Sequence, residues 1–178
     1  LWLYNLHYFN DLKCSASEER KAQLHKLILS WIDHNLPFDG VGWEPYPLSI
    51  RIVNLVKWQL RFQVYDERII SSLAAQVRVL NSSIEYHIRG NHLLANAKAL
   101  VFAGCFFDGP EANKWLKKGM KILALEIEEQ ILNDGGHFER SPMYHALVLE
   151  DMLDLENLFI SNSGKFSNYE KKVGSWSK

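Results

Sequence analysis

The chain contains 178 residues, 47% of them apolar, and its 20 basic and 21 acidic residues leave a formal net charge of -1. This size and composition predict one ordinary globular domain with its own core, and they exclude collagen-like or largely disordered chains. The balanced charge gives no reason to expect a nucleic acid or an anionic membrane as partner, and no apolar run is long enough for insertion into a bilayer.

Six helices are predicted in chain order, because apolar residues recur at helical spacing between residues that start or stop helices. Their predicted ranges are 17–36, 47–65, 67–87, 91–107, 110–131 and 142–159. Pro47 and Pro142 suit first helical positions, and Ser141 suits the N-cap of the last helix. No stretch alternates as a strand does, so the chain is predicted to be all-α.

Short connections favour antiparallel neighbours, so the second, fourth and sixth helices are expected to run parallel, with their starts at one end. The second and fourth helices are apolar almost all round, whereas the first and fifth carry charged faces, which predicts an inner and an outer layer. We expect an incomplete α/α toroid built from antiparallel helical hairpins over residues 1–160. Residues 161–178 are expected to be a polar tail or the start of a truncated further helix, in a fragment of a longer protein.

Two of these helix starts concentrate polar and protonatable residues, at positions 89–92 and 137–145. A helix start presents unpaired N–H groups and the positive end of the macrodipole, so it favours an anionic substrate or a phenolate. Tyr144 is therefore a candidate proton-transferring group, and Asn91 can hydrogen-bond a carboxylate without titrating. His92 is a candidate base, donor or orienting group.

Structural interpretations stand beside these functional ones. Tyr144 can pack its ring on a neighbour, and Asn91 can simply cap its helix. His137 and His145 lie near a turn, where a lone histidine is more often a structural group. For Arg51 an internal ion pair is the preferred interpretation.

Other residues suit the binding of an acidic sugar. Arg89 and Arg140 are candidates for a bidentate grip on a carboxylate, although each can also pair with an internal acid. Trp43 and Tyr46 offer stacking surfaces for a sugar ring, or else form the edge of the core.

Metals and organic cofactors are not expected. Cys14 and Cys105 lack the paired spacing of a disulfide framework or a zinc site. No pair of His, Cys or acidic residues has ligand spacing on one helix face, and no glycine-rich phosphate loop is present.

Two motifs carry a resemblance to a known family: Arg89-Gly90-Asn91-His92-Leu93-Leu94, and Asp134-Gly135-Gly136-His137-Phe138-Glu139-Arg140-Ser141-Pro142-Met143-Tyr144-His145. With Trp43-Glu44-Pro45-Tyr46-Pro47 and the aromatic opening stretch, they resemble the N-terminal α/α toroid of the heparinase II/III-like polysaccharide lyases, which include alginate lyases. The resemblance extends to about residue 159.

This resemblance implies a bacterial carbon-oxygen lyase that cleaves an acidic, uronic-acid-containing polysaccharide, such as a glycosaminoglycan, by β-elimination. At the matching positions Asn91, alone or with His92, would neutralise the substrate carboxylate, and Tyr144 would transfer a proton as the acid, or as both acid and base. The substrate-binding candidates are Arg89, Arg140, Trp43, Tyr46, Glu139 and His145. No cofactor or metal is implied for this step.

Members of the family also carry a downstream β-sandwich domain that supplies a further catalytic histidine, so the isolated chain is expected to be inactive. Two alternatives remain open: a glycoside hydrolase on the same toroid, with Glu44 and Glu139 as paired acids, and a non-catalytic glycan-binding helical module linked to bacterial surface polysaccharide. The localisation stays open as well. An upstream export signal would direct the protein to the periplasm or outside the cell, and a cytoplasmic location is not excluded.

Overall fold

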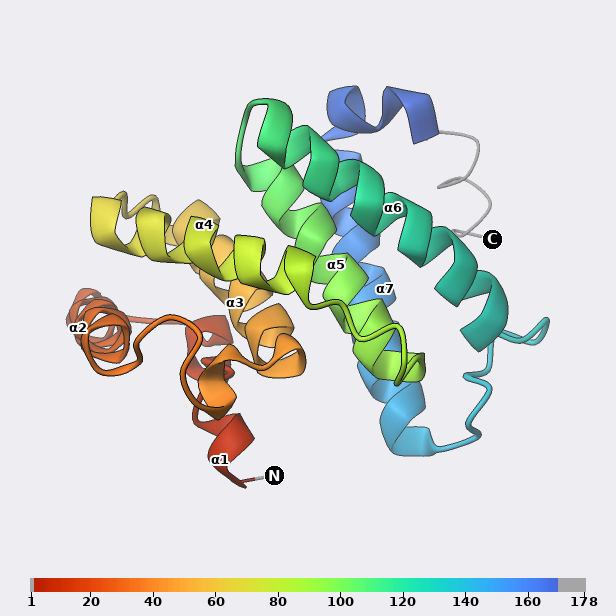
Figure 1. Ribbon diagram of the computed structural model, residues 1–178, viewed down its shortest axis with the longest axis horizontal. Helices are drawn as coiled ribbons and strands as arrows, with labels where there is room; N and C mark the ends of the chain where they lie inside the picture. Colours follow the sequence, from red (N-terminus) through yellow and green to blue (C-terminus); the bar gives the residue numbers. More distant parts are fainter. Residues whose placement is uncertain (1, 170–178) are drawn as a thin grey trace. The chain divides into compact units, whose positions relative to one another are not determined.

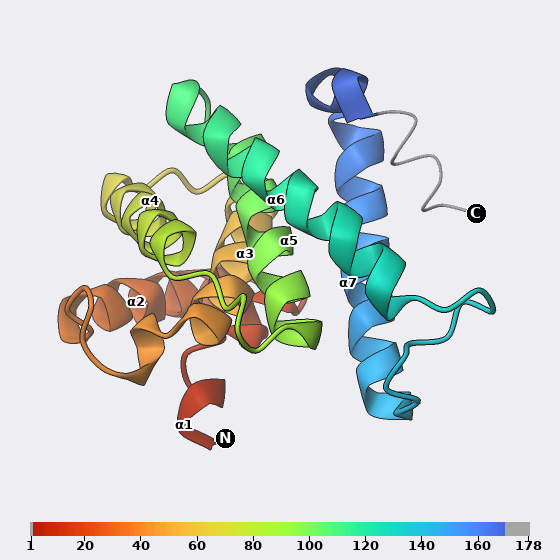
Figure 2. The ribbon, with the colours of Figure 1, turned by 45° about the vertical axis from the view of Figure 1, so that its right-hand side comes forward.

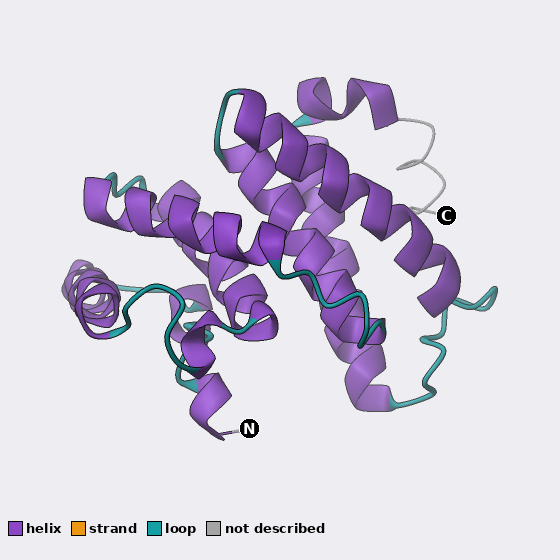
Figure 3. Ribbon diagram, viewed as in Figure 1, coloured by secondary structure: helices purple, strands orange, loops and turns teal. Residues whose placement is uncertain are grey.

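The computed structural model describes residues 2–169, which form helices joined by loops (Figures 1 and 3). The α-helices are α1 (Trp2–Asn5), α2 (Glu18–His34), α3 (Pro45–Phe62), α4 (Glu67–Ser82), α5 (Gly90–Phe106), α6 (Pro110–Gln130) and α7 (Pro142–Ser161), and the 3-10 helices are η1 (Asn10–Lys13), η2 (Val41–Trp43) and η3 (Ser163–Tyr169). In this part of the chain, β structure is limited to one isolated bridge between Ile131 and His137. The predicted all-α class is confirmed, and no helix within residues 2–169 has the length and apolarity needed to cross a membrane.

The six predicted helices correspond to α2 through α7, with small shifts at their ends. Helix α3 begins at Pro45 instead of Pro47. Helix α7 begins at Pro142 as predicted, but the Ser141 side chain at its N-cap position accepts no hydrogen bond from the helix. The predicted cap is therefore correct in position and wrong in its bonding.

Helix α4 ends at Ser82, earlier than the predicted residue 87, for a specific reason. The backbone N–H of Glu85 would bond to the carbonyl four residues earlier if the helix continued. It donates instead to Oδ1 of Asn96, at 2.9 Å. This bond ties the segment after α4 to the side of α5.

The chain divides into two compact units, residues 1–84 and 85–178. In the described part, the first unit contains α1 to α4, and the second contains α5 to α7 and η3. The predicted domain over residues 1–160 is thus made of two separately compact parts, and its boundary at residue 160 stays a prediction. Of the predicted tail, residues 163–169 form η3, and residues 170–178 lie outside the described residues.

Arg51 on α3 is fully buried in the first unit, where it donates only to neutral groups. Its Nε donates to Oε1 of Gln76 at 2.8 Å, and its two Nη atoms donate to the carbonyl oxygens of His7 and Gly42, at 3.0 and 2.7 Å. Burial lowers the pKa of Arg51 to about 9, so the group remains charged at neutral pH. The expected internal ion pair of Arg51 is therefore wrong, because its partners are carbonyl and amide oxygens rather than a carboxylate.

In the second unit, α5 is the buried helix: every residue from Leu93 to Cys105 is shielded from solvent. Helices α6 and α7 both pack on it. Figures 1 and 2 show that α5 and α7 run in the same direction. Helix α6, which lies between them in the sequence, runs in the opposite direction. Within this unit, the predicted parallel course of alternate helices and the buried character of the inner helix are present.

Two glycines bring α5 and α6 into backbone contact. A Cβ atom on Gly104 would lie 2.7 Å from the Cβ of Leu116, and one on Gly119 would lie 2.8 Å from the carbonyl oxygen of Ala97. These separations are shorter than any normal contact between such atoms. Side chains at the two positions are therefore excluded unless the helices separate.

A buried cation joins α5 to α7. Lys98 exposes only 6% of its side chain and bonds to the carboxylates of Asp151, at 2.7 Å, and Asp154. Burial opposes the charge on this ammonium group, but the two carboxylates outweigh that cost and raise the pKa of Lys98. Because Lys98 comes from α5 and both acids come from α7, these two ion pairs fix the position of α7 along α5.

Replacing Lys98 by Met should destabilise the protein strongly, because it leaves two largely buried carboxylates without a counter-charge. We expect a loss of about 3–5 kcal/mol in the free energy of unfolding, measured by urea denaturation. Lys121→Met, on the exposed face of α6, is the matched control and should change stability by less than about 0.5 kcal/mol. A similar small effect of both variants would contradict the role given to Lys98.

Candidate functional site

The loop between α6 and α7 folds back on the end of α6 and carries most of the second motif. The N–H of Phe138 donates to the carbonyl of Gln130 at 2.9 Å, and the N–H of Leu132 donates to the carbonyl of Gly136 at 2.9 Å. Gly135 has φ of 80°, in the left-handed region that glycine adopts readily. The predicted helix stop at residues 133–136 is therefore a tight turn that brings residues 137–141 back beside the helix end.

The buried amide of Gln130 attaches this loop to the start of α5. Its Nε2 donates to the carbonyl oxygen of Gly90, at 2.9 Å, and to a carboxylate oxygen of Glu126, at 2.7 Å. Its Oε1 lies 3.2 Å from Nε2 of His137. One side chain, 1% exposed, thus connects the end of α6, the first residue of α5 and the loop before α7.

The same contacts fix the proton on His137. Because the Gln130 nitrogen faces two acceptors, its oxygen must face His137, whose Nε2–H is the donor. The lone pair of this ring lies on Nδ1, which is buried without a partner among the described residues. Burial lowers the pKa of His137, nearby His145 lowers it further, and Glu139 opposes the shift. His137 is therefore a 2% exposed histidine whose burial favours the neutral form, and in that form Nδ1 keeps an unused acceptor.

Tyr144 lies in the first turn of α7, beside His137. The centroids of the two rings are 6.5 Å apart, and the rings are tilted by 38°. Tyr144 is half-buried, and its hydroxyl makes no hydrogen bond with residues 2–169. The packing interpretation of Tyr144 is therefore correct for its ring, while its hydroxyl keeps its hydrogen-bonding capacity.

Asn91 and His92 lie in the first turn of α5, and both are half-buried. Arg89 occupies the N-cap position and makes no side-chain cap, so the alternative interpretation of Asn91 as the helix cap is wrong. The Asn91 amide makes no hydrogen bond with the described residues. His92 differs, because its Nδ1 lies 3.1 Å from Oε1 of Glu85, a buried carboxylate.

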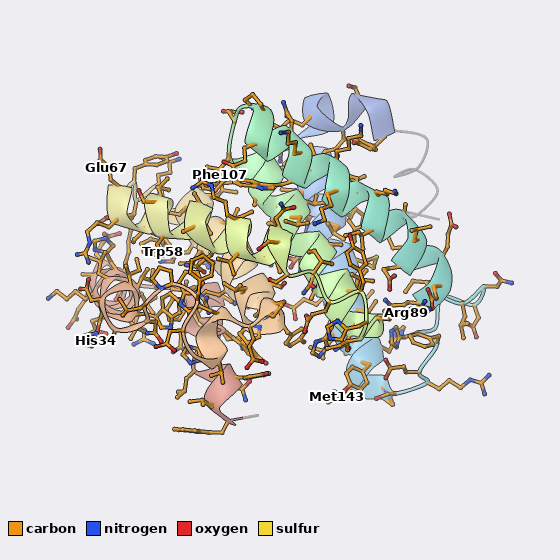
Figure 4. All side chains as sticks on the ribbon, viewed as in Figure 1. His34, Trp58, Glu67, Arg89, Phe107 and Met143 are labelled. Carbon is orange, nitrogen blue, oxygen red and sulfur yellow. The ribbon has the colours of Figure 1, made fainter. Side chains whose placement is uncertain are left out.

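The two helix starts are therefore at the same end of the second unit. Contacts run from Gly90 through Gln130 and His137 to Tyr144. Figure 4 labels Arg89, immediately before α5, and Met143, in the first turn of α7, and both lie away from Phe107 at the other end of α5. Asn91, His92 and Tyr144 thus lie at one end, although their catalytic roles stay predictions.

The charged candidates surround this end. Oε1 of Glu139 lies 3.6 Å from the position that a Cβ on Gly90 would occupy, so this carboxylate lies against the start of α5. Arg89 lies 3.8 Å from Glu129, with both side chains largely exposed, a weak pairing that leaves the guanidinium open to other acceptors. Arg140 and His145 are exposed, and the Arg140 side chain makes no ion pair with the described residues.

The two aromatic candidates, Trp43 and Tyr46, belong to the first unit. Trp43 is 7% exposed, packs against Trp31 and Phe38, and donates its Nε1–H to the carbonyl of Asn35. An indole ring so enclosed exposes little surface for stacking on a sugar ring. This agrees with the alternative interpretation, in which Trp43 forms the edge of the core.

Tyr46 is half-buried, with its ring edge-on to Tyr8 at 6.0 Å. Glu44, the proposed hydrolytic partner of Glu139, accepts a hydrogen bond from the Tyr4 hydroxyl. The expectation that the start of α3 lies at the same end as the starts of α5 and α7 stays a prediction.

Sequence reasoning missed Glu85, Gln130 and Asn96, which hold the candidate residues in place. Asn96 follows His92 by four residues and therefore lies on the same helix face, a spacing that could have indicated a shared partner. Nothing in the sequence around Glu85 or Gln130 points to the partners that they reach. Among the described residues, no group of three or more His, Cys, Asp or Glu side chains is arranged to hold a metal ion.

The buried histidine predicts how stability depends on pH. Because the folded state resists protonation of His137, the unfolded chain binds more protons as the pH falls through the ordinary histidine range, and the free energy of unfolding decreases there. His137→Gln, which keeps a donor near Nε2, should lose less stability between about pH 8 and pH 5.5 than the unsubstituted chain. Urea denaturation at the two pH values measures this difference, and equal losses would contradict it.

Comparisons with known proteins give consistent matches. Residues 18–170 match the family described as Heparinase II/III N-terminus. A heparin-sulfate lyase of Bacteroides stercoris is 40% identical over 84 residues, which cover 42% of this chain and 13% of that protein. A heparin-sulfate lyase of Pedobacter heparinus is 30% identical over 124 residues, which cover 65% of this chain and 18% of that protein.

Among solved structures, the crystal structure of heparinase III is similar to this chain with a TM-score of 0.69 and 27% sequence identity. The similarity covers 90% of this chain and 27% of that one. The chain thus spans about a quarter or less of the length of the relatives that it matches.

Proposed function

Because the chain belongs to the heparinase II/III N-terminal family, we propose that it forms the helical part of a lyase that cleaves a uronic-acid-containing polysaccharide by β-elimination. The observation that carries this proposal is the common location of an amide and a phenol at the starts of two parallel helices, α5 and α7. Neither Asn91 nor Tyr144 spends its polar group on a hydrogen bond with the described residues, so both can serve a ligand.

In the proposed reaction, the Asn91 amide donates a hydrogen bond to the carboxylate at C5 of the uronic acid. This bond stabilises the negative charge that develops on the carboxylate when the C5 proton leaves, and one such preorganised donor contributes about 3 kcal/mol. The dipole of α5 acts in the same sense, because its positive end faces the developing charge.

Tyr144 completes the proton transfer. Tyr144 acts as both base and acid: its phenolate takes the C5 proton as the C5–H bond breaks, a C4–C5 double bond forms as the C4–O bond to the next sugar breaks, and Tyr144 then returns the proton to the leaving oxygen. The start of α7 favours a tyrosine in this role, because the helix dipole stabilises its phenolate after the proton has left. Arg89 and Arg140, both exposed at this end, would bind further acidic groups of the polymer.

We further propose that the substrate is an acidic glycosaminoglycan and that activity needs a second domain of the same polypeptide. The named activity of the relatives, heparin-sulfate lyase, makes heparan sulfate the first substrate to test. The proposal of a further domain rests on the small share of each relative that the chain covers. It predicts that the 178-residue chain alone yields no product while the full-length protein does.

Tyr144→Phe should abolish product formation by the full-length protein. The assay measures the ultraviolet absorbance of the unsaturated product on heparan sulfate and alginate, and the expected loss is about 100-fold or more. Tyr86→Phe, at an exposed tyrosine of the same unit, is the control and should retain activity. Saturated reducing ends, with activity retained in Tyr144→Phe and lost in Glu139→Gln, would support the hydrolase instead.

Asn91→Ala should lower kcat by about 100- to 1,000-fold, because the donor acts mainly on charge that develops in the transition state. Asn113→Ala, an exposed asparagine on α6, is the matched control. An unchanged kcat with a raised KM in Asn91→Ala would show that the amide only binds substrate.

A further inference from the structure

The imidazole of His137 contacts both the end of α6 and the start of α7. Its Nε2 lies 3.2 Å from Oε1 of Gln130, the last residue of α6. The centre of its ring lies 6.5 Å from that of Tyr144, in the first turn of α7. Because His137 is only 2% exposed, it connects the buried amide of Gln130 to the proposed proton-transferring phenol inside the second unit.

Gln130 determines which nitrogen of His137 has the lone pair. Since Nε2–H donates to Gln130, the lone pair of the neutral ring lies on Nδ1 and is directed away from Gln130. Nδ1 has no hydrogen-bond partner among the described residues. An acceptor that is buried without a donor costs free energy, and buried acceptors in folded proteins are almost always paired. This lone pair therefore needs a donor close to the ring.

Tyr144 has the donor that this lone pair lacks. Apart from Gln130, four residues act on the His137 ring by ring contact or by charge: Phe138, Glu139, Tyr144 and His145. Of these, only the tyrosine and the histidine have a side-chain hydrogen to donate when Glu139 is ionised. The tyrosine ring contacts His137, and its hydroxyl makes no hydrogen bond with residues 2–169. At this separation of the rings, the hydroxyl and Nδ1 can be joined directly or by one bridging water.

We propose that His137 is a positioning residue for Tyr144, whose hydroxyl donates a hydrogen bond to Nδ1 of His137, directly or through one water molecule. The bond uses the hydroxyl hydrogen and leaves the lone pairs of the oxygen for the substrate. The inference rests on the proposed lyase function only for its kinetic consequence.

In that reaction the bond also gives the hydroxyl proton a place to go. Transfer of the proton to Nδ1 leaves the Tyr144 phenolate, with which the reaction begins, and a His137 imidazolium whose Nε2–H stays on Gln130. Burial and nearby His145 lower the pKa of His137 and favour the neutral pair in the resting chain, whereas Glu139 raises this pKa and favours the transfer.

The hydrogen bond is measured by the ¹⁵N signals of the histidine rings in the 178-residue chain at about pH 8.5, where ordinary imidazoles are neutral. His137→Gln assigns the two signals of His137 by their disappearance. We expect the proton on Nε2, and we expect Tyr144→Phe to move the Nδ1 signal to the position of an acceptor without a donor. A bridging water would also lose one of the polar partners that hold it. Tyr86→Phe, at an exposed tyrosine of the same unit, is the control and should move neither signal.

Three results of these spectra would overturn the proposal. A proton on Nδ1 in the unsubstituted chain does so without any variant. An unchanged Nδ1 signal in folded Tyr144→Phe shows that the hydroxyl is not the donor. An Nδ1 signal that moves in His145→Gln and not in Tyr144→Phe identifies His145 as the donor instead.

Two substitutions of His137 separate positioning from a purely structural role. His137→Gln keeps an amide near Nε2, with its bond to Gln130, and removes the acceptor at Nδ1, whereas His137→Asn keeps an acceptor near Nδ1 and loses the bond to Gln130. In the full-length protein, His137→Gln should lower kcat about 10- to 100-fold with little change in KM, and His137→Asn should be the more active of the two. Urea denaturation should rank their stabilities in the opposite order. A structural role predicts the same order for activity and stability, and that result overturns the proposal.

The spectra and the kinetics together distinguish this proposal from the lyase assignment. The spectra need no activity, so they decide the hydrogen bond even if His137→Asn does not fold. Absence of lyase activity in the full-length protein, together with the expected change in Tyr144→Phe, would reject the proposed function and leave the hydrogen bond intact. An active enzyme whose kcat is unchanged in folded His137→Gln would overturn the positioning role.

Discussion

The candidate site depends on the buried amide of Gln130, which bonds to the first residue of α5 and to the loop before α7 at the same time. Each of its polar atoms has a partner, and in a buried environment the loss of any one bond leaves an unsatisfied group. The bonds therefore hold two helix starts together although they are about fifty residues apart in the chain. Lys98 fixes the same two helices further along their length, through Asp151 and Asp154.

Much of this arrangement could be predicted from local sequence. The helices, their order and the turn at residues 133–136 follow from apolar periodicity and from proline and glycine positions, and the common direction of α5 and α7 follows from short connections. Asn91 and Tyr144 were therefore found by their place at helix starts. The sequence motifs also indicated the family that the comparisons support.

Local sequence patterns do not predict the hydrogen bonds that side chains make with distant parts of the chain. The early end of α4 depends on Asn96, which lies eleven residues beyond Glu85 in the chain and outside the pattern of any single helix. The same holds for Arg51, expected to pair with an acid but surrounded by carbonyl oxygens, and for His137, whose proton position depends on Gln130. Helical periodicity describes which face is buried, and it carries no information on which polar groups meet there.

The contacts of Arg51 bear on where the first unit begins. The family match starts at residue 18, yet this buried guanidinium takes one of its acceptors from His7, eleven residues earlier. A shorter piece cut at residue 18 would therefore lose an acceptor for a cation that has no access to water, and the trimmed protein would be expected to fold poorly. The first unit thus depends on residues that precede the segment matching the family.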